Sequence, residues 1–279
     1  MDHHPIFDLF KPVNSVSSGE HMYDYLGAAT RASYKRGWAK HVHAAGKSLT
    51  PSRPAVNEHY FDWTATLTAV ARSRGTFRMA ELGAGWAPWL VRGALAAKQK
   101  SAIKKIELLG IEADTVHFEW MKEHFRDNGL DPDKHHLLHG AAAGQSGTLS
   151  FPVIDEPDVV YGASLRGAKA GVPCIEVRAY TIPEILAFFS GPLDFLHVDI
   201  QAAEYETLPP AMADLKKGVK SIMIGTHTSE TMHDGLVEQF RSAGWIEVMN
   251  YARNRTSMTP YGEVSFDDGF LLFDNPEFV

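Results

Sequence analysis

The sequence contains a single cysteine, Cys174, among 279 residues. One thiol cannot form an intrachain disulfide, and it cannot supply the several thiolates of a structural metal cluster. We therefore expect a protein of a reducing compartment, and the cytoplasm is the natural one.

Long hydrophobic runs and an excess of positive charge are also missing. No stretch reaches the ~20 apolar residues of a membrane helix, and the N-terminus, MDHHPIFDLFKP, lacks the pattern of a secretory leader. The formal net charge is −7, which gives no general attraction to nucleic acid or to an anionic membrane. We expect a soluble protein with neither of these partners, and the sequence leaves its oligomeric state open, a homo-oligomer included.

Hydrophobic residues make up 44% of the chain, enough at this length for one large α/β core and a modest appendage. Pro51 and Pro54 interrupt the chain before the first clear helix–strand pattern. We predict an N-terminal helical extension over residues 1–56, with a helix from Glu20 to Ala45, and a catalytic α/β domain over residues 57–279.

The most informative stretch is Phe77 to Gln99, which reads FRMAELGAGWAPWLVRGALAAKQ. The pattern is that of a short strand, a tight turn at Gly83 and Gly85, and a helix rich in Ala and Leu. Because glycine has no Cβ, such a turn lets a ligand approach the backbone, and the helix N-terminus behind it offers unpaired N–H groups. Many strand-to-helix turns need glycine for a positive φ alone, so the turn by itself does not establish a nucleotide site.

A dinucleotide fits this turn poorly. Dinucleotide-binding turns have a third small residue three positions after the second glycine, where this sequence has Pro88. Glu81, at the end of the strand, would also place a carboxylate beside two phosphate charges. A cationic ligand such as S-adenosylmethionine suits the turn better, and the cofactor contacts predicted here are Glu81, Gly83, Ala84, Gly85 and Trp86.

Two further strand ends complete the predicted cofactor site. Lys104 to Ile111 predicts a second strand that runs into Glu112 and Ala113, where a carboxylate can accept both ribose hydroxyls. A solvated carboxylate or a helix N-cap is the alternative role for Glu112. His135 to Leu138 predicts a third strand, followed by small residues beside which an adenine ring can lie: Gly140, Ala141 and Ala142.

The remaining chain continues the alternation of helices and strands. Thr148 to Val153 and Cys174 to Arg178 predict an inserted hairpin, and Trp245 to Tyr251 with Gly269 to Phe273 predict a terminal one, joined by the polar connection 252–268. The other predicted strands are Phe195 to Ile200 and Val219 to Ile224, and the predicted helices span residues 57–75, 115–128, 181–190, 202–215 and 234–243.

These landmarks resemble those of known methyltransferases. Glu81-Leu82-Gly83-Ala84-Gly85 resembles the E/D-x-G-x-G motif of class I S-adenosylmethionine-dependent methyltransferases, and the terminal hairpin matches their antiparallel last strand. The segments HVDIQAAE (197–204) and IGTH (224–227) resemble the FkbM family, which shows K-x-D-x-E-G-x-E and I-E-x-H. Asp199, Glu204 and His227 match this pattern. The departures are His197, Gln201, Ala202 and Gly225.

The resemblance implies an α/β, Rossmann-like class I methyltransferase sheet, mostly parallel with an antiparallel last strand and helices on both faces, and S-adenosyl-L-methionine as cofactor. It also implies that the N-terminal extension can form a lid. His227 or Asp199 would serve as the base for a hydroxyl acceptor, with Asp199 alternatively holding the cofactor's amino group and Glu204 as the third catalytic candidate. Because Gln201 and Gly225 replace two acidic groups of the family, we expect no obligatory metal.

The sequence thus predicts a methyltransferase acting on an oxygen of a sugar-like or other polar small molecule, an acceptor class that rests on the resemblance alone. One alternative is an NAD(P)-dependent oxidoreductase on a Rossmann domain, against which Pro88 and the terminal hairpin argue. Another is a non-catalytic S-adenosylmethionine-binding protein, which the changes at Gln201 and Gly225 favour.

Overall fold

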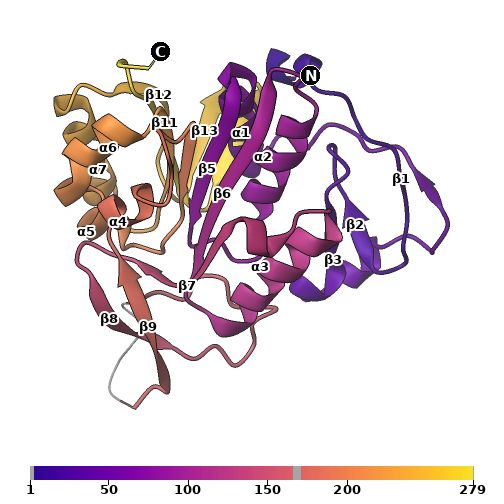
Figure 1. Ribbon diagram of the computed structural model, residues 1–279, viewed down its shortest axis with the longest axis horizontal. Coiled ribbons are helices and arrows are strands. Elements are labelled where there is room, and N and C mark those ends of the chain that lie inside the picture. Colours follow the sequence, from indigo (N-terminus) through magenta and orange to yellow (C-terminus); the bar gives the residue numbers. More distant parts are fainter. Residues whose placement is uncertain (1–2, 166–170, 279) are drawn as a thin grey trace.

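A computed structural model describes residues 3–165 and 171–278, which fold around a nine-stranded sheet (Figure 1). Its order is β12-β15-β11-β10-β5-β6-β7-β9-β8. The strand β15 runs antiparallel to β11 and β12, and the other central strands are mutually parallel. The central strands are β5 (Gly75–Leu82), β6 (Ile103–Glu112), β7 (His136–Ala142), β10 (Phe195–Val198), β11 (Ser221–Thr226), β12 (Ile246–Tyr251) and β15 (Gly269–Asp274).

Helices cover both faces of the sheet because its strands alternate apolar side chains on the two sides (Figure 1). Met79 packs in one core and Ala80, the next residue of β5, packs in the other. The first face carries α1 (His59–Arg72), α2 (Pro88–Lys98) and α3 (Thr115–Asp127), and the second carries α4 (Ile182–Leu186), α5 (Glu204–Thr207), α6 (Met212–Gly218) and α7 (Glu230–Ser242). The predicted doubly covered, mostly parallel sheet is confirmed.

The inserted hairpin is confirmed and extends the sheet. The strands β8 (Gly147–Pro152) and β9 (Cys174–Tyr180) pair antiparallel, and β9 also pairs parallel with the last three residues of β7. Those three residues, 140–142, were expected after the strand. They are strand residues because β9 supplies the backbone partners that keep them extended.

The predicted helix from Glu20 to Ala45 is wrong, and the residues before α1 are not a helical extension. This segment forms two short antiparallel pairs and three single turns of 3-10 helix. Gly27 and Gly37 adopt positive φ, which a continuous helix over 20–45 does not allow. The pairs are β1 (Ser15–Val16) with β4 (Ser48–Leu49) and β2 (His21–Tyr23) with β3 (Ala29–Arg31); the 3-10 turns are Pro5–Leu9, Ala32–Tyr34 and Trp38–His41.

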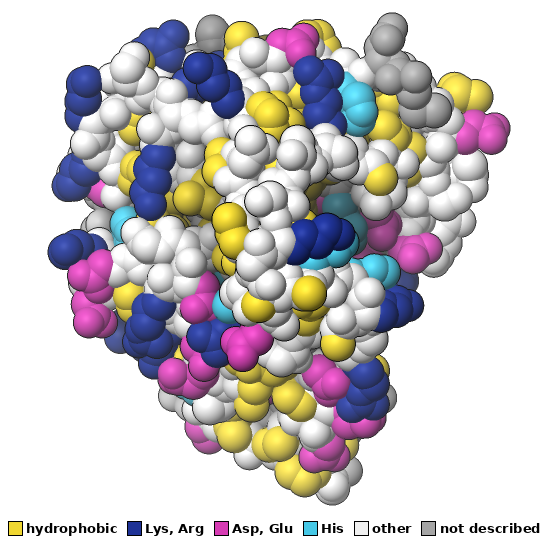
Figure 2. All heavy atoms as spheres, turned by 90° about the vertical axis from the view of Figure 1, so that its right-hand side faces the viewer, with side chains coloured by type: hydrophobic (Ala, Val, Ile, Leu, Met, Phe, Trp, Pro, Cys, Tyr) yellow, Lys and Arg dark blue, Asp and Glu magenta, His cyan; other side chains and the backbone are white. Residues whose placement is uncertain are grey.

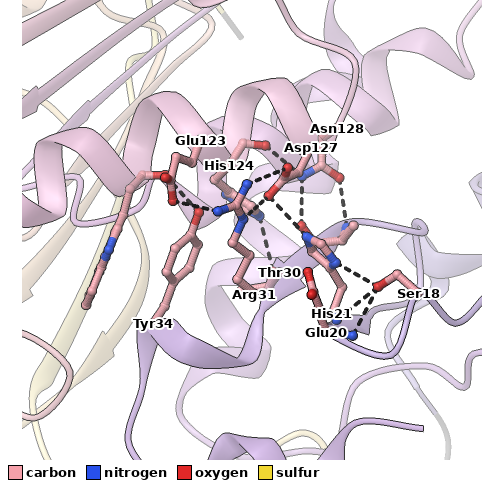
Figure 3. A network of polar contacts seen from close by, with 12 residues as sticks. Ser18, Glu20, His21, Thr30, Arg31, Tyr34, Glu123, His124, Asp127 and Asn128 are labelled. Atoms are coloured by element: carbon pink, nitrogen blue, oxygen red, sulfur yellow. Dashed lines mark hydrogen bonds and ion pairs between the residues drawn. The ribbon is translucent and has the colours of Figure 1, made fainter. Parts of the chain in front are cut away.

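A polar network holds this N-terminal segment against α3 (Figure 3). Arg31 of β3 donates to Asp127 at 2.7 Å and to Glu123 at 3.0 Å, and His21 lies 3.1 Å from Asp127. The side chain of Asn128 accepts the backbone N–H of Ala29 at 2.8 Å. The end of α3 is therefore the anchor of the N-terminal segment.

Two predicted elements in the second half of the chain are divided. The expected helix 202–215 breaks into α5, a 3-10 turn at Pro209–Ala211 and α6, because the two prolines at 209 and 210 interrupt helical hydrogen bonding. The expected polar connection 252–268 contains a hairpin of β13 (Arg255–Thr259) and β14 (Gly262–Phe266). Within the described residues, every helix is too short or too polar to span a lipid bilayer.

Candidate functional site

A cavity of about 530 Å³ opens at the carboxyl ends of β5, β6, β7 and β10. Parallel α/β sheets bind their ligands at this edge, and the volume is typical of a small-molecule site. The structure brings every predicted cofactor residue to this one cavity: Glu81, Gly83, Ala84, Gly85, Trp86, Glu112, Ala113, Gly140, Ala141, Ala142 and Asp199. The ligand role of each of them stays a prediction.

Glycine is required at the two positions of the turn for different physical reasons. Gly83 has φ +73°, and a Cβ there would lie 1.9 Å from the backbone oxygen of Asp199, so the turns after β5 and β10 touch. Gly85 has φ +54°, and a Cβ there would meet nothing within 4 Å. Gly83 is thus required by packing, whereas Gly85 supplies a left-handed backbone beside open space.

Glu81 lies at the end of β5 with only 2% of its surface exposed. One carboxylate oxygen accepts the backbone N–H of Leu90 at 2.9 Å, within the first turn of α2. Burial raises the pKa of Glu81 to about 7, although nearby backbone donors and His197 act in the opposite direction. A ligand cation beside this carboxylate would favour its ionised form.

Glu112 is also buried, at the end of β6. Its two oxygens accept the backbone N–H groups of Gly85 at 2.7 Å and Asp114 at 2.7 Å. Burial raises the pKa of Glu112, and these N–H donors oppose the rise. The N-cap of α3 is Asp114, whose carboxylate accepts the first free N–H groups of that helix, so the N-cap alternative for Glu112 is wrong.

An apolar compartment adjoins Glu112. Ala113, Ala141 and Phe151 are buried there, with Ile154 and Leu165 partly buried against them, and all of them line the cavity. A flat aromatic ligand would fill such a slot. Gly140 lies at its edge for a structural reason, because a Cβ there would come within 2.6 Å of the backbone oxygen of Arg178 in β9.

Aromatic side chains from distant segments surround the mouth of the cavity. The ring of Trp86 lies 5.0 Å from that of Tyr161 and 5.6 Å from that of Trp38. Arg36, next to the cavity-lining Lys35, binds Asp158 at 2.9 Å and thereby links the N-terminal segment to the loop after β8. Trp38, from the N-terminal segment, thus lies at this rim.

The three predicted catalytic residues contact one another, and Asp199 is the one of them that lines the cavity. His227 contacts Glu204 through Nδ1 at 3.0 Å and Asp199 through Nε2 at 3.1 Å. Burial alone would lower the pKa of His227, but the two carboxylates raise it to about 10. A ring that is already protonated at neutral pH cannot accept a proton, so this environment argues against His227 as the general base.

Asp199 is the member of this group that reaches the cavity, with 42% of its side chain exposed. Burial would raise the pKa of Asp199, but the hydrogen bond and charge of His227 lower it below its usual value. Gln201 donates to Asp199 at 2.8 Å. The next residue, Ala202, has φ +80°, which is strained for a residue with a Cβ.

Several cavity residues were not identified from the sequence. Asp267 and Asp268 line the cavity from the connection after β14, and Arg92 does so with its guanidinium stacked on Trp63 and Trp89. The sequence signal that could have indicated Arg92 is its position three residues after Trp89, which places both side chains on one face of the helix. Glu58, which precedes α1, and Trp63 of α1 also line the cavity, whereas Tyr60 of the same helix is fully buried in the core.

Comparison with known proteins gives one sequence relative of substantial coverage. No protein-family model matches the chain. A protein of Jannaschia sp. (strain CCS1), described as a methyltransferase, is 30% identical over 224 residues, which cover 77% of this chain and 78% of the relative.

Similar solved structures include precorrin-6y C5,15-methyltransferase from Geobacter metallireducens GS-15, with 13% identity, a TM-score of 0.42, and coverage of 75% of this chain and 85% of that one. Methyltransferase FkbM from Methylobacillus flagellatus KT has 12% identity and a TM-score of 0.43, with coverage of 72% of this chain and 44% of that one.

Proposed function

The chain belongs to the class I S-adenosylmethionine-dependent methyltransferases, and we propose that it methylates an oxygen atom of a sugar-like or other polar small molecule. The observation that carries this proposal is that one cavity joins a buried carboxylate at Glu81 to a rim of mixed polar and aromatic side chains. The first part suits the cofactor and the second suits a polar acceptor.

The residues present fit the cofactor. Glu81 offers a buried carboxylate to the ammonium group, and Glu112 can accept ribose hydroxyls with lone pairs that its two backbone contacts leave free. The apolar compartment around Ala113 and Phe151 suits the adenine ring. Arg92 lies over the rings of Trp63 and Trp89 and pairs through Nε with Asp24 at 2.9 Å, and its remaining N–H groups can bind the methionine carboxylate.

When bound, the cofactor supplies an electrophilic methyl group on a sulfonium. In an in-line transfer, a new O–C bond would replace the C–S bond, whose electron pair would stay on sulfur, and the proton of the acceptor hydroxyl would leave to water. Asp199 is the carboxylate exposed at this end of the cavity, and His227 and Gln201 hold it in place. These contacts orient Asp199 toward the acceptor, so that the residues contribute chiefly by positioning.

The acceptor end of the cavity is polar. Lys35, Glu58, His59, Asp267 and Asp268 line it together with the ring of Trp38. Hydrogen-bonding groups of both kinds beside an aromatic face would suit a ligand with several hydroxyls. An S-adenosylmethionine-binding protein without turnover remains the second candidate, because Gln201 and Gly225 occupy positions where the similar family has acids.

We propose a small-molecule acceptor and no nucleic-acid partner. On the face shown in Figure 2, side chains of Lys and Arg are interspersed with those of Asp and Glu. The formal net charge of −7 is likewise unfavourable for binding a polyanion.

Calorimetry and a methylation assay test this function together. We expect the protein to bind S-adenosylmethionine and S-adenosylhomocysteine, to ignore NAD, and to methylate a hydroxyl in a panel of polyols and glycosides. Binding of NAD instead of the sulfonium would overturn the proposal in favour of an oxidoreductase. Cofactor binding without transfer to any hydroxyl acceptor would favour the non-catalytic alternative.

A further inference from the structure

No placement of hydrogen atoms turns all the polar contacts around Nε2 of His227 into hydrogen bonds. Asp199 Oδ1 and Gln201 Nε2 each lie 3.1 Å from this nitrogen, and they lie 2.8 Å from one another. If Nε2 carried a proton, it could donate to Asp199, but its N–H would point at the amide N–H₂ of Gln201, which is also a donor. If Nε2 carried no proton, it could accept from Gln201, but its lone pair would face the lone pairs of Asp199. Turning the amide of Gln201 would place its oxygen against the carboxylate.

A cation at this point removes the conflict. An octahedral divalent cation holds its ligands at about 2.1 Å, so neighbouring ligands lie about 3 Å apart. That spacing matches the separations around Nε2. With the amide of Gln201 turned, its oxygen, Asp199 and the bare Nε2 would all direct lone pairs at the same point.

Two further carboxylates increase the negative charge of the cluster. Asp268 Oδ2 lies 3.7 Å from His227 Nε2, while its other oxygen binds Arg253 at 3.2 Å. Glu204 is fully buried, and ligand atoms of Asp199, Glu204 and His227 all lie within 4.8 Å of one another. Glu204 Oε2 has no hydrogen-bond partner among the described residues. A buried carboxylate oxygen without a donor is costly unless a cation lies nearby.

The contact between Glu204 and Nδ1 of His227 completes this arrangement. By accepting the Nδ1 proton at 3.0 Å, Glu204 leaves the lone pair of the ring on Nε2, where the cluster converges. Histidines that bind metals are commonly held by a carboxylate on their other ring nitrogen. Glu204 is therefore a positioning residue for the imidazole.

We propose that Asp199, His227, Gln201 and Asp268 bind a divalent cation of the Mg²⁺ or Mn²⁺ kind at the acceptor end of the cavity. The ligand set of carboxylates, one amide oxygen and one imidazole suits such an ion. The sequence predicted no obligatory metal because Gln201 and Gly225 replace acids. The structure supplies a carboxylate from elsewhere, since Asp268 reaches the cluster from the connection between β14 and β15.

The consequence for catalysis rests on the proposed hydroxyl methylation. A cation beside Asp199 would bind the acceptor oxygen and lower the pKa of its hydroxyl, and the proton would leave to water. As a ligand through Nε2, His227 would not be available as a base, and the cation would supply this activation instead. The methyl transfer itself is unchanged, with the electron pair of the C–S bond remaining on sulfur.

The test is Mn²⁺ binding to the full chain after treatment with EDTA, measured by the loss of the free Mn²⁺ signal in electron paramagnetic resonance, without cofactor or acceptor. We expect one Mn²⁺ per chain, displaced by excess Mg²⁺. Asp199→Asn and Asp268→Asn should each weaken binding at least tenfold. Both side chains are about half exposed, so these variants should fold. Asp267→Asn is the matched control, because it changes a neighbouring cavity carboxylate outside the cluster.

Absence of Mn²⁺ binding, or equal binding by the wild type and both cluster variants, would overturn the site. Calorimetry with S-adenosylmethionine on the same EDTA-treated protein separates this result from a failure of the proposed function. Cofactor binding without Mn²⁺ binding would overturn the cation site alone. Mn²⁺ binding that depends on Asp199 and Asp268, in a protein that methylates no hydroxyl compound, would support the site and overturn the proposed acceptor chemistry.

Discussion

Burial raises the pKa of Glu81 to about 7, so its carboxyl group changes charge within the physiological pH range. In the unfolded chain the same group titrates near 4.5. The folded protein therefore binds this proton more tightly than the unfolded chain, and the stabilisation is complete below pH 4.5 and is lost as the pH rises through 7.

The first prediction compares the wild type with Glu81→Gln, which keeps the shape without the charge. The free energy of unfolding of the cofactor-free wild type should fall between pH 4.5 and pH 7 relative to the variant, by about 3 kcal/mol. Urea unfolding over this pH range measures the difference. Parallel pH profiles of the two proteins would contradict the burial of an ionised Glu81.

The same group predicts a pH-dependent affinity for the cofactor. If the ammonium group of S-adenosylmethionine pairs with the ionised form of Glu81, as proposed, affinity should decrease as the pH falls below about 7, approaching about tenfold per pH unit. Calorimetric titration at a series of pH values measures this decrease. In Glu81→Gln the affinity should be low at every pH and should lack the slope.

Glu112 gives a third prediction at the scale of the residue. Glu112→Gln should weaken cofactor binding about tenfold, or about 1.4 kcal/mol, because one acceptor of the ribose hydroxyls becomes a donor. Glu119→Gln is the control, since Glu119 is an exposed glutamate of α3 paired with Lys122. Equal affinities for the two variants would remove Glu112 from the ribose site.

At the scale of the element, the N-terminal pair β2–β3 depends on its anchor on α3. Burial would raise the pKa of Asp127, but the hydrogen bond from Arg31 lowers it, so the docking is retained at neutral pH and weakens as the pH falls. We expect Asp127→Asn to speed amide hydrogen exchange of the β2–β3 strands several-fold while the amides of α3 stay protected. Glu119→Gln, on the same helix, should leave β2–β3 unchanged, and an Asp127→Asn variant with the same exchange as the wild type would show that the network adds no stability.

The elements differ in how far the sequence determines them. The strand–turn–helix unit of β5 and α2 could be predicted because its apolar run, glycine turn and helical spacing are local properties. The strands β2 and β3 could not, since each has three residues and their stability comes from distant partners on α3, chiefly Asp127 and Asn128. The hairpin β13–β14 was not predicted either, because the polar residues of its outer face gave the segment the composition of a loop.

At the scale of the whole molecule, the cavity is closed by segments from separate parts of the chain. Arg36 links the N-terminal segment to Asp158, near Tyr161 and the aromatic rim. Arg36→Gln should accelerate dissociation of S-adenosylhomocysteine several-fold, because the two rim segments would separate more readily. Stopped-flow fluorescence of the rim Trp residues measures this rate. Arg255→Gln is the control, because it breaks an exposed ion pair with Glu230, and neither residue lines the cavity; it should leave the rate unchanged. If Arg36→Gln also dissociated at the wild-type rate, the contact between Arg36 and Asp158 would have no role in closing the cavity.

The candidate site was predictable where strand ends define it and unpredictable where loops complete it. Glu81, Glu112 and Asp199 end neighbouring parallel strands, so their convergence follows from the order of the sheet. Asp268 and Trp38 arrive on irregular segments whose paths depend on tertiary packing, and no local pattern places them. The raised pKa of His227 could likewise not be predicted, because it depends on two carboxylates, Asp199 and Glu204, that contact one ring.

The contact of Gly83 with the backbone of Asp199 limits how this protein could change its substrate range. The two turns meet along a seam with no room for a single methyl group, so the distance between the turn after β5 and the turn after β10 is fixed there. New acceptors would have to be accommodated at the periphery, by resizing the side chains around Trp38 and Asp267. Libraries for altered selectivity belong at those positions, while the seam itself should accept no substitution.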